Sequence, residues 1–219
     1  MYNNFFKRII DIVFSSILIL ILLIPFLAIM LLIKLTSKGP VFFKQLRIGR
    51  NGVPFYIIKF RTMIVGAENM KEGVTIIGND SRVTKFGKFL RKMSIDELPQ
   101  VFNVFLGHMS FVGPRAPAYY FFPKYENLDD NCKKRFLVKP GITGYSQVIG
   151  RNSFSWYQKI EHDNIYVDKV HKYGLLIDIW IVLKTIVRVF SGTNTEETEQ
   201  VKEDNERFLK EYGGKNDGK

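Results

Sequence analysis

A long uncharged stretch near the start of the chain restricts the folds that this sequence can adopt. Between Ile12 and Ile33 no residue is charged, and nearly all are Ile, Leu, Val, Phe or Met. These 22 residues would form a helix about 33 Å long at about 1.5 Å per residue, which matches a hydrocarbon core about 30 Å thick. A cleavable signal peptide has a shorter apolar core and a cleavage site of small residues, and neither is found here. We therefore expect this segment to be retained and to contact lipid.

Basic residues flank the stretch on both sides. Lys7 and Arg8 precede it, and it is followed by Lys34, Lys38, Lys44, Arg47 and Arg50. Because cytoplasmic flanks carry the positive charge, both ends are expected on the cytoplasmic side. Pro25 would kink a helix, and the halves Ile12–Ile24 and Pro25–Ile33 are each too short to span a membrane. The pattern favours a re-entrant helix, although a kinked single span also accommodates Pro25.

The chain divides into three expected segments. Its 219 residues can bury one substantial core. We expect a membrane-inserted segment at 1–36, a domain on the membrane face at 37–192 and a polar tail at 193–219. The tail has the pattern of a surface helix at Val201–Tyr212. Asp11, at the membrane edge, is expected to pair with Lys7 or Arg8, which lie one helical turn away.

The charge and the few metal-binding residue types narrow the possible partners. A net charge of +11 calls for an acidic partner, which can be nucleic acid, anionic lipid or a phosphorylated substrate. No nucleic-acid-binding motif is found. The single cysteine, Cys132, excludes an internal disulfide and a cysteine-rich metal site. His108, His162 and His171 do not have the spacing of metal ligands.

Strands are expected after the apolar stretch. Val41–Phe43 and Phe55–Phe60 are rich in β-formers, and the Asn-Gly pair at Asn51 between them indicates a turn. In an extended strand Lys59 and Arg61 project from the same face. These two side chains could hold a diphosphate, or they could simply be solvated.

Two amphipathic helices are expected as well. Lys85–Met93 has an apolar stripe opposite a basic side, which is typical of a membrane-surface helix and also of an ordinary solvated one. In Leu175–Phe190 apolar residues cover half of the helical wheel, with Asp178, Lys184 and Arg188 on the other half. Those charges favour a helix lying on the membrane over one that crosses it, and a buried core helix is the alternative. The fold class is therefore α+β, with a re-entrant N-terminal helix, a small β-hairpin and amphipathic interfacial helices around a compact domain.

The adjacent carboxylates of Asp96 and Glu97 are the strongest candidate site. They precede apolar residues at helical spacing and Pro99, which fits the first turn of a helix, so we expect them at a helix N-terminus that favours anions. The upstream flank is basic, with Arg82, Lys85, Lys88, Arg91 and Lys92. Two acids in a basic surround suit phosphoryl transfer. The alternative is a capping box of Ser94 with Glu97 that only stabilises the helix end.

A second candidate is the glycine-containing turn at 139–144. Lys139-Pro140-Gly141-Ile142-Thr143-Gly144 has two glycines available for positive φ or for close backbone approach. It matches neither the P-loop nor the dinucleotide-binding pattern, so it is a weak candidate for a phosphate loop.

Taken together, the motifs resemble a known family. They are Lys7-Arg8 with Asp11, Gly39-Pro40-Val41-Phe42-Phe43 with Gln45 and Arg47, Lys59-Phe60-Arg61-Thr62-Met63, Asp80 with Arg82 and Thr84, Asp96-Glu97-Leu98-Pro99-Gln100, Asn103-Val104, Gly107, Met109-Ser110, Val112-Gly113-Pro114-Arg115, and Lys139–Gly144 with Gly150-Arg151. In this order they resemble the bacterial sugar transferases, in particular the monotopic phosphoglycosyl transferases of the polyprenol-phosphate type. The resemblance covers roughly residues 5 to 190, and the chain is expected to be the minimal catalytic form, without an added multi-span region. Trp156 with Gln158-Lys159 looks most like members that use UDP-linked N-acetylated amino or deoxyamino sugars, such as UDP-N,N'-diacetylbacillosamine.

The resemblance implies roles for particular residues. Asp96 would be the nucleophile that attacks the β-phosphorus of a UDP-sugar and holds the phospho-sugar covalently, and Glu97 would bind Mg²⁺. Undecaprenyl phosphate would then accept the phospho-sugar. The residues expected to bind substrate are Lys59, Arg61, Arg82, Arg91, Arg115, Arg151 and Asp163.

The resemblance also implies a place in the cell and leaves alternatives. The protein would act at the cytoplasmic face of the bacterial inner membrane, in the initiating step of glycoconjugate assembly, with membrane lipid and a possible second copy of itself as partners. Members often have Ser-Pro at the break in the membrane helix, whereas Ile24 precedes Pro25 here. A glycosyltransferase that releases UDP, or a non-enzymatic basic membrane adaptor, remains as an alternative class.

Overall fold

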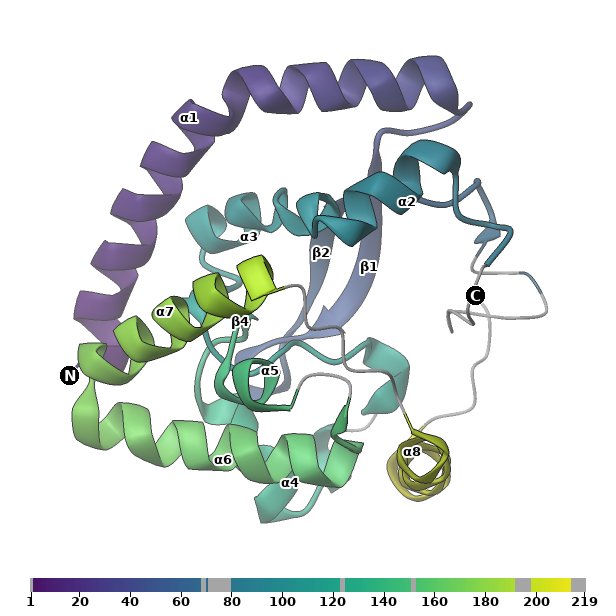
Figure 1. Cartoon of the computed structure of the whole chain (residues 1–219). Coiled ribbons are helices and arrows are strands. Elements are labelled where there is room, and N and C mark those ends of the chain that lie inside the picture. Colours follow the sequence, from purple (N-terminus) through teal and green to yellow (C-terminus); the bar gives the residue numbers. More distant parts are fainter. Residues whose placement is uncertain are drawn as a thin grey trace.

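A single long helix arches over the rest of the molecule in the computed structural model, which describes residues 2–67, 70, 80–122, 125–150, 153–191 and 198–213. After a π-helical turn, η1 (Tyr2–Phe6), helix α1 runs over Lys7–Thr36 and contains Pro25. Figure 1 shows α1 as two arms joined by a sharp bend. We attribute the bend to Pro25, because proline in a helix interior removes a hydrogen bond and clashes with the preceding turn. The most apolar window of α1 has a mean hydropathy of 3.2, and 11% of that window is buried.

Both arms of α1 contact the same body. The first arm carries Lys7, which forms an ion pair with Asp178 of helix α7 (Leu175–Ser191). On the second arm the ring of Phe26 lies 5.2 Å from that of Phe60 and 5.9 Å from that of Phe102. A straight helix of this length would carry one end away from the body, so the bend allows both arms to pack on it.

The strands form two small sheets. β1 (Phe42–Ile48) pairs with β2 (Pro54–Phe60) as an antiparallel hairpin, and the expected turn lies between them, with Asn51 at φ 55° and Gly52 at φ 80°. β3 (Ser110–Val112) pairs in parallel with β4 (Gly141–Thr143). At Gly141 an added Cβ would lie 2.1 Å from the backbone nitrogen of Gly113, so this pairing requires glycine.

Helices and short turns surround these sheets. They are η2 (Arg50–Gly52), α2 (Lys85–Lys92), η4 (Ile95–Glu97), α3 (Gln100–Leu106), η5 (Tyr119–Phe121), η6 (Tyr125–Asn127), α4 (Asp130–Lys134), η7 (Arg135–Leu137), α5 (Tyr145–Ile149), α6 (Trp156–Tyr173), α7 (Leu175–Ser191) and α8 (Glu199–Tyr212). In Figure 1, α2 and α3 lie between α1 and the rest, and α6 lies on the opposite side of the molecule. The α+β expectation is therefore confirmed.

The buried apolar residues form neighbouring clusters. Ile33 of α1, Leu90 of α2 and Val101 of α3 share one cluster, which fixes the α2–α3 region beneath α1. The helix expected at Val201–Tyr212 lies within α8, and its fully buried Phe208 packs edge-on against Phe122 at 5.5 Å. The C-terminal helix is thus part of the core.

Helix α7 exposes the apolar face that the sequence predicts. Its exposed apolar residues are Leu175, Leu176, Ile179, Trp180, Val182, Leu183, Ile186 and Val187. Ile181 and Asp178 are buried instead, and Tyr166 donates a hydrogen bond of 2.8 Å to Asp178.

The expected pairing of Asp11 with Lys7 or Arg8 is wrong. The Asp11 carboxylate accepts hydrogen bonds from the Ser110 hydroxyl at 3.0 Å and the Phe111 N–H at 3.2 Å. Lys7 pairs with Asp178, and Arg8 donates to the carbonyls of Val104 and Phe105 at the end of α3. Tertiary partners outweigh helical spacing here, because burial on the body leaves these side chains facing groups of other elements.

Candidate active site

The two candidate carboxylates lie in the short turn η4, between α2 and α3. Ser94 precedes the turn at φ 55°, and its side chain makes no capping hydrogen bond. The sequence predicted Asp96 and Glu97 at the N-terminus of a helix. Helix α3 begins only at Gln100, so the two carboxylates lie just before that helix, in η4. The capping-box alternative is wrong, because the Glu97 carboxylate is bound by two cationic side chains.

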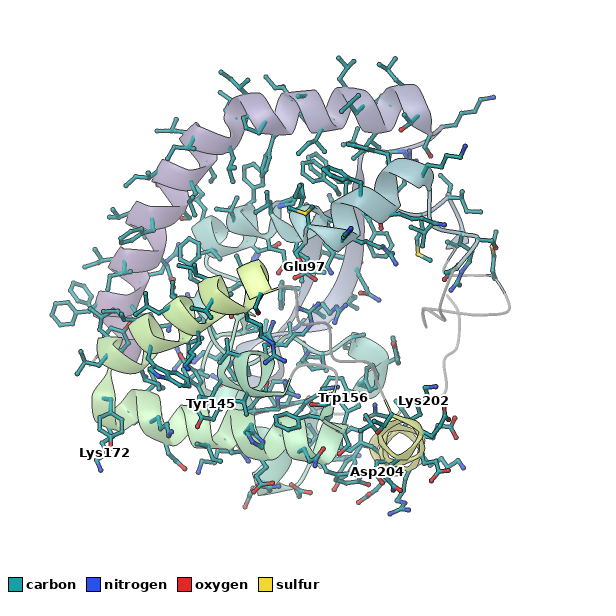
Figure 2. The ribbon with its side chains drawn as sticks, in the orientation of Figure 1. Glu97, Tyr145, Trp156, Lys172, Lys202 and Asp204 are labelled. Atoms are coloured by element: carbon teal, nitrogen blue, oxygen red, sulfur yellow. The ribbon has the colours of Figure 1, made fainter. Side chains whose placement is uncertain are left out.

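Glu97 is held by Lys59 of β2 and Arg115 of the loop after β3. Its Oε1 lies 2.7 Å from Lys59 Nζ and 2.8 Å from Arg115 Nη2, and its Oε2 lies 3.4 Å from Arg115 Nη1. Figure 2 shows Glu97 beside the strands of the hairpin, in the interior of the arrangement. Burial alone would raise the pKa of Glu97, but Arg115 and Lys59 hold it well below its usual range. Glu97 is therefore an anion with fixed orientation.

Asp96 has a different environment. Its carboxylate makes no hydrogen bond or ion pair with the residues that the structure describes, and it is partly exposed. Burial raises its pKa, Glu97 adds to the rise, and the nearby charges of Lys59, Arg91 and Arg115 oppose it. A carboxylate that is near cations but bonded to none of them is available to react.

The rest of the fold positions the two residues that hold Glu97. Asn103 of α3 accepts from the Ile58 N–H at 3.0 Å and donates to the Tyr56 carbonyl at 2.7 Å, which ties α3 to the strand that carries Lys59. The backbone carbonyl of Arg115 accepts from Arg135 Nη2 at 2.8 Å.

Arg47 secures the same loop. It donates to the carbonyl of Ala116 at 2.8 Å and to Gln45 at 2.6 Å. Burial, together with the charge of Arg115, lowers the pKa of Arg47 to about 10.

Arg91 belongs to the site, whereas Arg82 pairs with Asp80. Arg91 Nε donates to Thr62 Oγ1 at 2.7 Å, and its charge favours the ionised form of Asp96. Arg82 is buried and binds both carboxylate oxygens of Asp80, whose pKa falls to about 2 because of these hydrogen bonds. Substrate binding by Arg82 is therefore not what this geometry favours, since its guanidinium is already bound.

Two of the expected substrate-binding residues lie elsewhere. Arg61 is 6% exposed and donates to the carbonyls of Lys38 and Ser37 at 2.7 and 2.8 Å, so it joins the end of β2 to the end of α1 and forms no pair with Lys59. Asp163 is 1% exposed and lies 2.7 Å from both Arg135 Nη2 and Ser146 Oγ. In both cases a partner within the protein takes the place expected for substrate.

Two candidates remain, which are Arg151 and the turn at 139–144. Arg151 lies outside the described residues. In the turn at 139–144, the Gly141 N–H donates to the Pro114 carbonyl, and an added Cβ at Gly144 would lie 2.1 Å from the Gly113 carbonyl oxygen. The glycines therefore serve close backbone approach, and the phosphate-loop reading of this turn is not supported.

The site fits Mg²⁺ as a partner shared with substrate. No cluster of three His, Cys, Asp or Glu side chains is present among the described residues. Mg²⁺ commonly uses one or two carboxylates together with substrate phosphates and water. Glu97 Oε2 makes only its 3.4 Å contact with Arg115, and Asp96 makes none, so both carboxylates keep free coordinating capacity.

Several residues that support the site were given no site role from the sequence, although Asn103, Arg47 and Thr62 belong to the motifs that carry the family resemblance. Asn103 carries a signal that could have been used, because it is the one polar residue in Val101–Phe105. Arg135 carries none, since it ends the basic run that starts at Lys133 and resembles a solvated charge. Arg47 and Thr62 likewise have no spacing that marks them.

The fold and the site define a class of protein in which two unequal carboxylates and several cations lie beneath a long apolar helix, a layout suited to an anionic substrate. The family model described as bacterial sugar transferase matches residues 2–192, and this chain belongs to that family. It is 44% identical over 194 residues to the UDP-glucose:undecaprenyl-phosphate glucose-1-phosphate transferase of Klebsiella pneumoniae, covering 86% of this chain and 41% of that protein. It is 38% identical over 195 residues to the uncharacterized sugar transferase EpsL of Bacillus subtilis (strain 168), covering 89% and 92%. It is 39% identical over 191 residues to the UDP-N-acetylgalactosamine-undecaprenyl-phosphate N-acetylgalactosaminephosphotransferase of Aeromonas hydrophila, covering 86% and 44%. This chain thus spans less than half of the length of the Klebsiella and Aeromonas relatives.

Proposed function

We propose that this chain transfers a phospho-sugar from a UDP-sugar to undecaprenyl phosphate and releases UMP. The names of the Klebsiella and Aeromonas relatives support the two substrates. The observation that carries the proposal is the inequality of the two carboxylates. Glu97 is fixed by two cations, whereas Asp96 has no bonded partner among the described residues.

Asp96 is proposed as the nucleophile. One of its oxygens attacks the β-phosphorus, the bond from that phosphorus to the bridging oxygen breaks, and UMP leaves with the electron pair. An oxygen of undecaprenyl phosphate then attacks the same phosphorus, and the acyl phosphate bond breaks to restore the carboxylate. A covalent carboxylate intermediate divides one difficult displacement into two easier ones.

The basic residues are proposed to bind and orient the diphosphate. Lys59 and Arg115 already face the carboxylates, and Arg91 lies close enough to affect the pKa of Asp96. Catalysis of phosphoryl transfer depends mainly on such positioning and charge stabilisation. Glu97 would hold Mg²⁺, which when bound reduces the charge repulsion between the Asp96 carboxylate and the diphosphate.

The membrane is proposed as the place of reaction, on its cytoplasmic face. Both arms of α1 pack on one body while most of its apolar residues stay exposed, and α7 has an exposed apolar face as well. A re-entrant α1 accounts for both facts, because the two ends of the helix then stay on one side. A lipid phosphate and a soluble nucleotide could both reach a site beneath such a helix.

A panel of UDP-sugars with undecaprenyl phosphate and Mg²⁺ tests the reaction. The expected result is release of UMP together with a polyprenyl diphosphate-sugar for one or a few of the sugars. From the resemblance at Trp156 with Gln158-Lys159 we expect N-acetylated amino or deoxyamino sugars among them. Release of UDP would instead support transfer of the sugar alone. No turnover with any sugar, by a folded protein in lipid, would support the adaptor alternative.

A further inference from the structure

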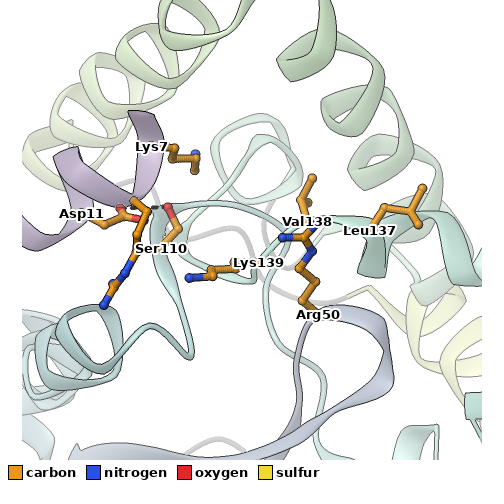
Figure 3. Close-up of a pocket in the computed structure, with 8 residues that line it drawn as sticks. Lys7, Asp11, Arg50, Ser110, Leu137, Val138 and Lys139 are labelled. Atoms are coloured by element: carbon orange, nitrogen blue, oxygen red, sulfur yellow. Dashed lines mark hydrogen bonds between the residues drawn. The ribbon is translucent and has the colours of Figure 1, made fainter. Parts of the chain in front are cut away.

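A second basic cavity lies apart from the carboxylate site, at the N-terminal end of α1. It is lined by Lys7, Arg8, Asp11, Arg50, Ser110, Leu137, Val138 and Lys139. Figure 3 shows Asp11 and Ser110 on one side, Arg50 with Val138 on the other, and Lys139 between them. Lys59, Arg91, Asp96, Glu97 and Arg115 do not line it, so it is distinct from the candidate active site.

Partners within the protein account for only part of the positive charge. Lys7 is paired with Asp178, and Arg8 is bound to two carbonyls at the end of α3. Among the described residues that line the cavity, Asp11 is the one with an acidic side chain, and it accepts hydrogen bonds from the Ser110 hydroxyl and the Phe111 N–H.

Arg50 and Lys139 have no such partners. Neither side chain makes a hydrogen bond or ion pair with the residues that the structure describes, and Arg50 Nε is buried without a hydrogen-bond partner. Burial lowers the pKa of Lys139, the charges of Arg8 and Arg50 lower it further, and the charge of Asp11 opposes this without a hydrogen bond to Lys139. The cavity is therefore lined by four cations and by the single carboxylate of Asp11, so its lining keeps a positive charge that suits an anion from outside.

We propose that this cavity binds a phosphate group, with Arg50 and Lys139 as its main ligands and the Ser110 hydroxyl as a neighbouring polar group. Arginine and lysine are the usual ligands of phosphate oxygens, and arginine adds paired donors. The cavity lies where α1 begins, next to its exposed apolar residues, and this position favours the headgroup of a membrane lipid as the source of the phosphate. The proposal does not depend on the transfer reaction proposed above.

Native mass spectrometry of the full chain in detergent tests the proposal with phosphatidic acid, which carries a phosphate monoester, and phosphatidylcholine, which has no net charge. The double variant Arg50→Gln/Lys139→Gln removes the two ligands. The matched control, Arg207→Gln/Lys210→Gln, removes the same charges from exposed positions on α8. Arg50→Lys/Lys139→Arg keeps both charges in the cavity. Neither side chain has a bond within the described protein, so the neutral variant should fold, and circular dichroism checks this.

The wild type and the α8 control should retain phosphatidic acid in preference to phosphatidylcholine. The neutral cavity variant should bind it at least about tenfold more weakly, because two charge-assisted contacts to phosphate are lost. The charge-conserving variant should recover most of the binding. Inorganic phosphate is titrated in a parallel arm, and binding that requires Arg50 and Lys139 without retention of phosphatidic acid would assign the site to a soluble phosphate. Equal binding by the cavity variant and the control, in both arms, would overturn the proposal.

Discussion

The buried ion pair of Arg135 and Asp163 gives a prediction about stability whose magnitude follows from the structure. The two charges lie 2.7 Å apart and are each about 1% exposed at the side chain. Asp163→Asn keeps the shape and the hydrogen bond from Ser146 but leaves Arg135 as an uncompensated buried charge. Removing one partner of such a pair costs about 3–5 kcal/mol, so we expect the free energy of unfolding to fall by that amount.

A matched control exists on the same helix. Asp168 of α6 pairs with Lys134 at 2.8 Å, but this pair is exposed, so Asp168→Asn should cost about 0–1 kcal/mol. Urea unfolding measures the free-energy change of both variants. Tryptophan fluorescence is a suitable signal because the Trp156 ring lies beside the pair, with its centroid 5.5 Å from Arg135 Cζ. The double variant Arg135→Met/Asp163→Leu should recover much of the loss, since it leaves no unpaired charge. If Asp163→Asn costs no more than Asp168→Asn, leaving Arg135 unpaired is not costly and the buried-charge argument is refuted.

Three further predictions concern the site and the topology. Lys59→Met removes the main charge that lowers the pKa of Asp96, so the acid limb of the pH profile of kcat/KM should move to higher pH than in the wild type. An unmoved limb would show that this limb does not report Asp96. Arg115→Lys keeps the charge but loses the paired donors, so kcat should fall by about tenfold or more, and unchanged steady-state kinetics would make the residue structural. Cysteines placed singly by Asn4→Cys and Lys38→Cys should both be labelled by an impermeant maleimide from the cytoplasmic side. Labelling of position 4 from outside only would eliminate the re-entrant helix. The native Cys132 is buried.

The sequence predicted local elements well, because their signals are local. The Asn-Gly turn at Asn51 requires positive φ, and both turn residues adopt it. The apolar half of α7 is visible as a helical period, and it is the exposed face in the structure. The carboxylate pair was located from its basic flanks, and the structure brings Lys59, Arg91 and Arg115 to it.

The partners of charged residues could not be predicted in the same way. Arg61 and Asp163 are residue types that often bind substrate, but each is bound within the protein by groups distant in the sequence. Arg61 donates to carbonyls at the end of α1, and Asp163 pairs with the guanidinium of Arg135. Asp11 likewise bonds to β3 and not to its helical neighbours. Sequence spacing reports what a residue can reach along its own element, whereas burial against another element decides which partner it takes.

The covalent role of Asp96 is the central claim, and intact-protein mass spectrometry tests it most directly. The protein is mixed with the UDP-sugar selected by the panel and Mg²⁺, without undecaprenyl phosphate, and compared with Asp96→Asn and Glu97→Gln. Asp96 makes no bond within the described protein, so the asparagine variant should stay folded. We predict a mass increase of one phospho-sugar that maps to the Asp96 peptide in the wild type, a slower increase in Glu97→Gln, and none in Asp96→Asn because an amide cannot form the acyl phosphate. A wild type without adduct that still turns over, or an Asp96→Asn variant that releases UMP at a comparable rate, would contradict the claim and leave a single direct displacement in its place.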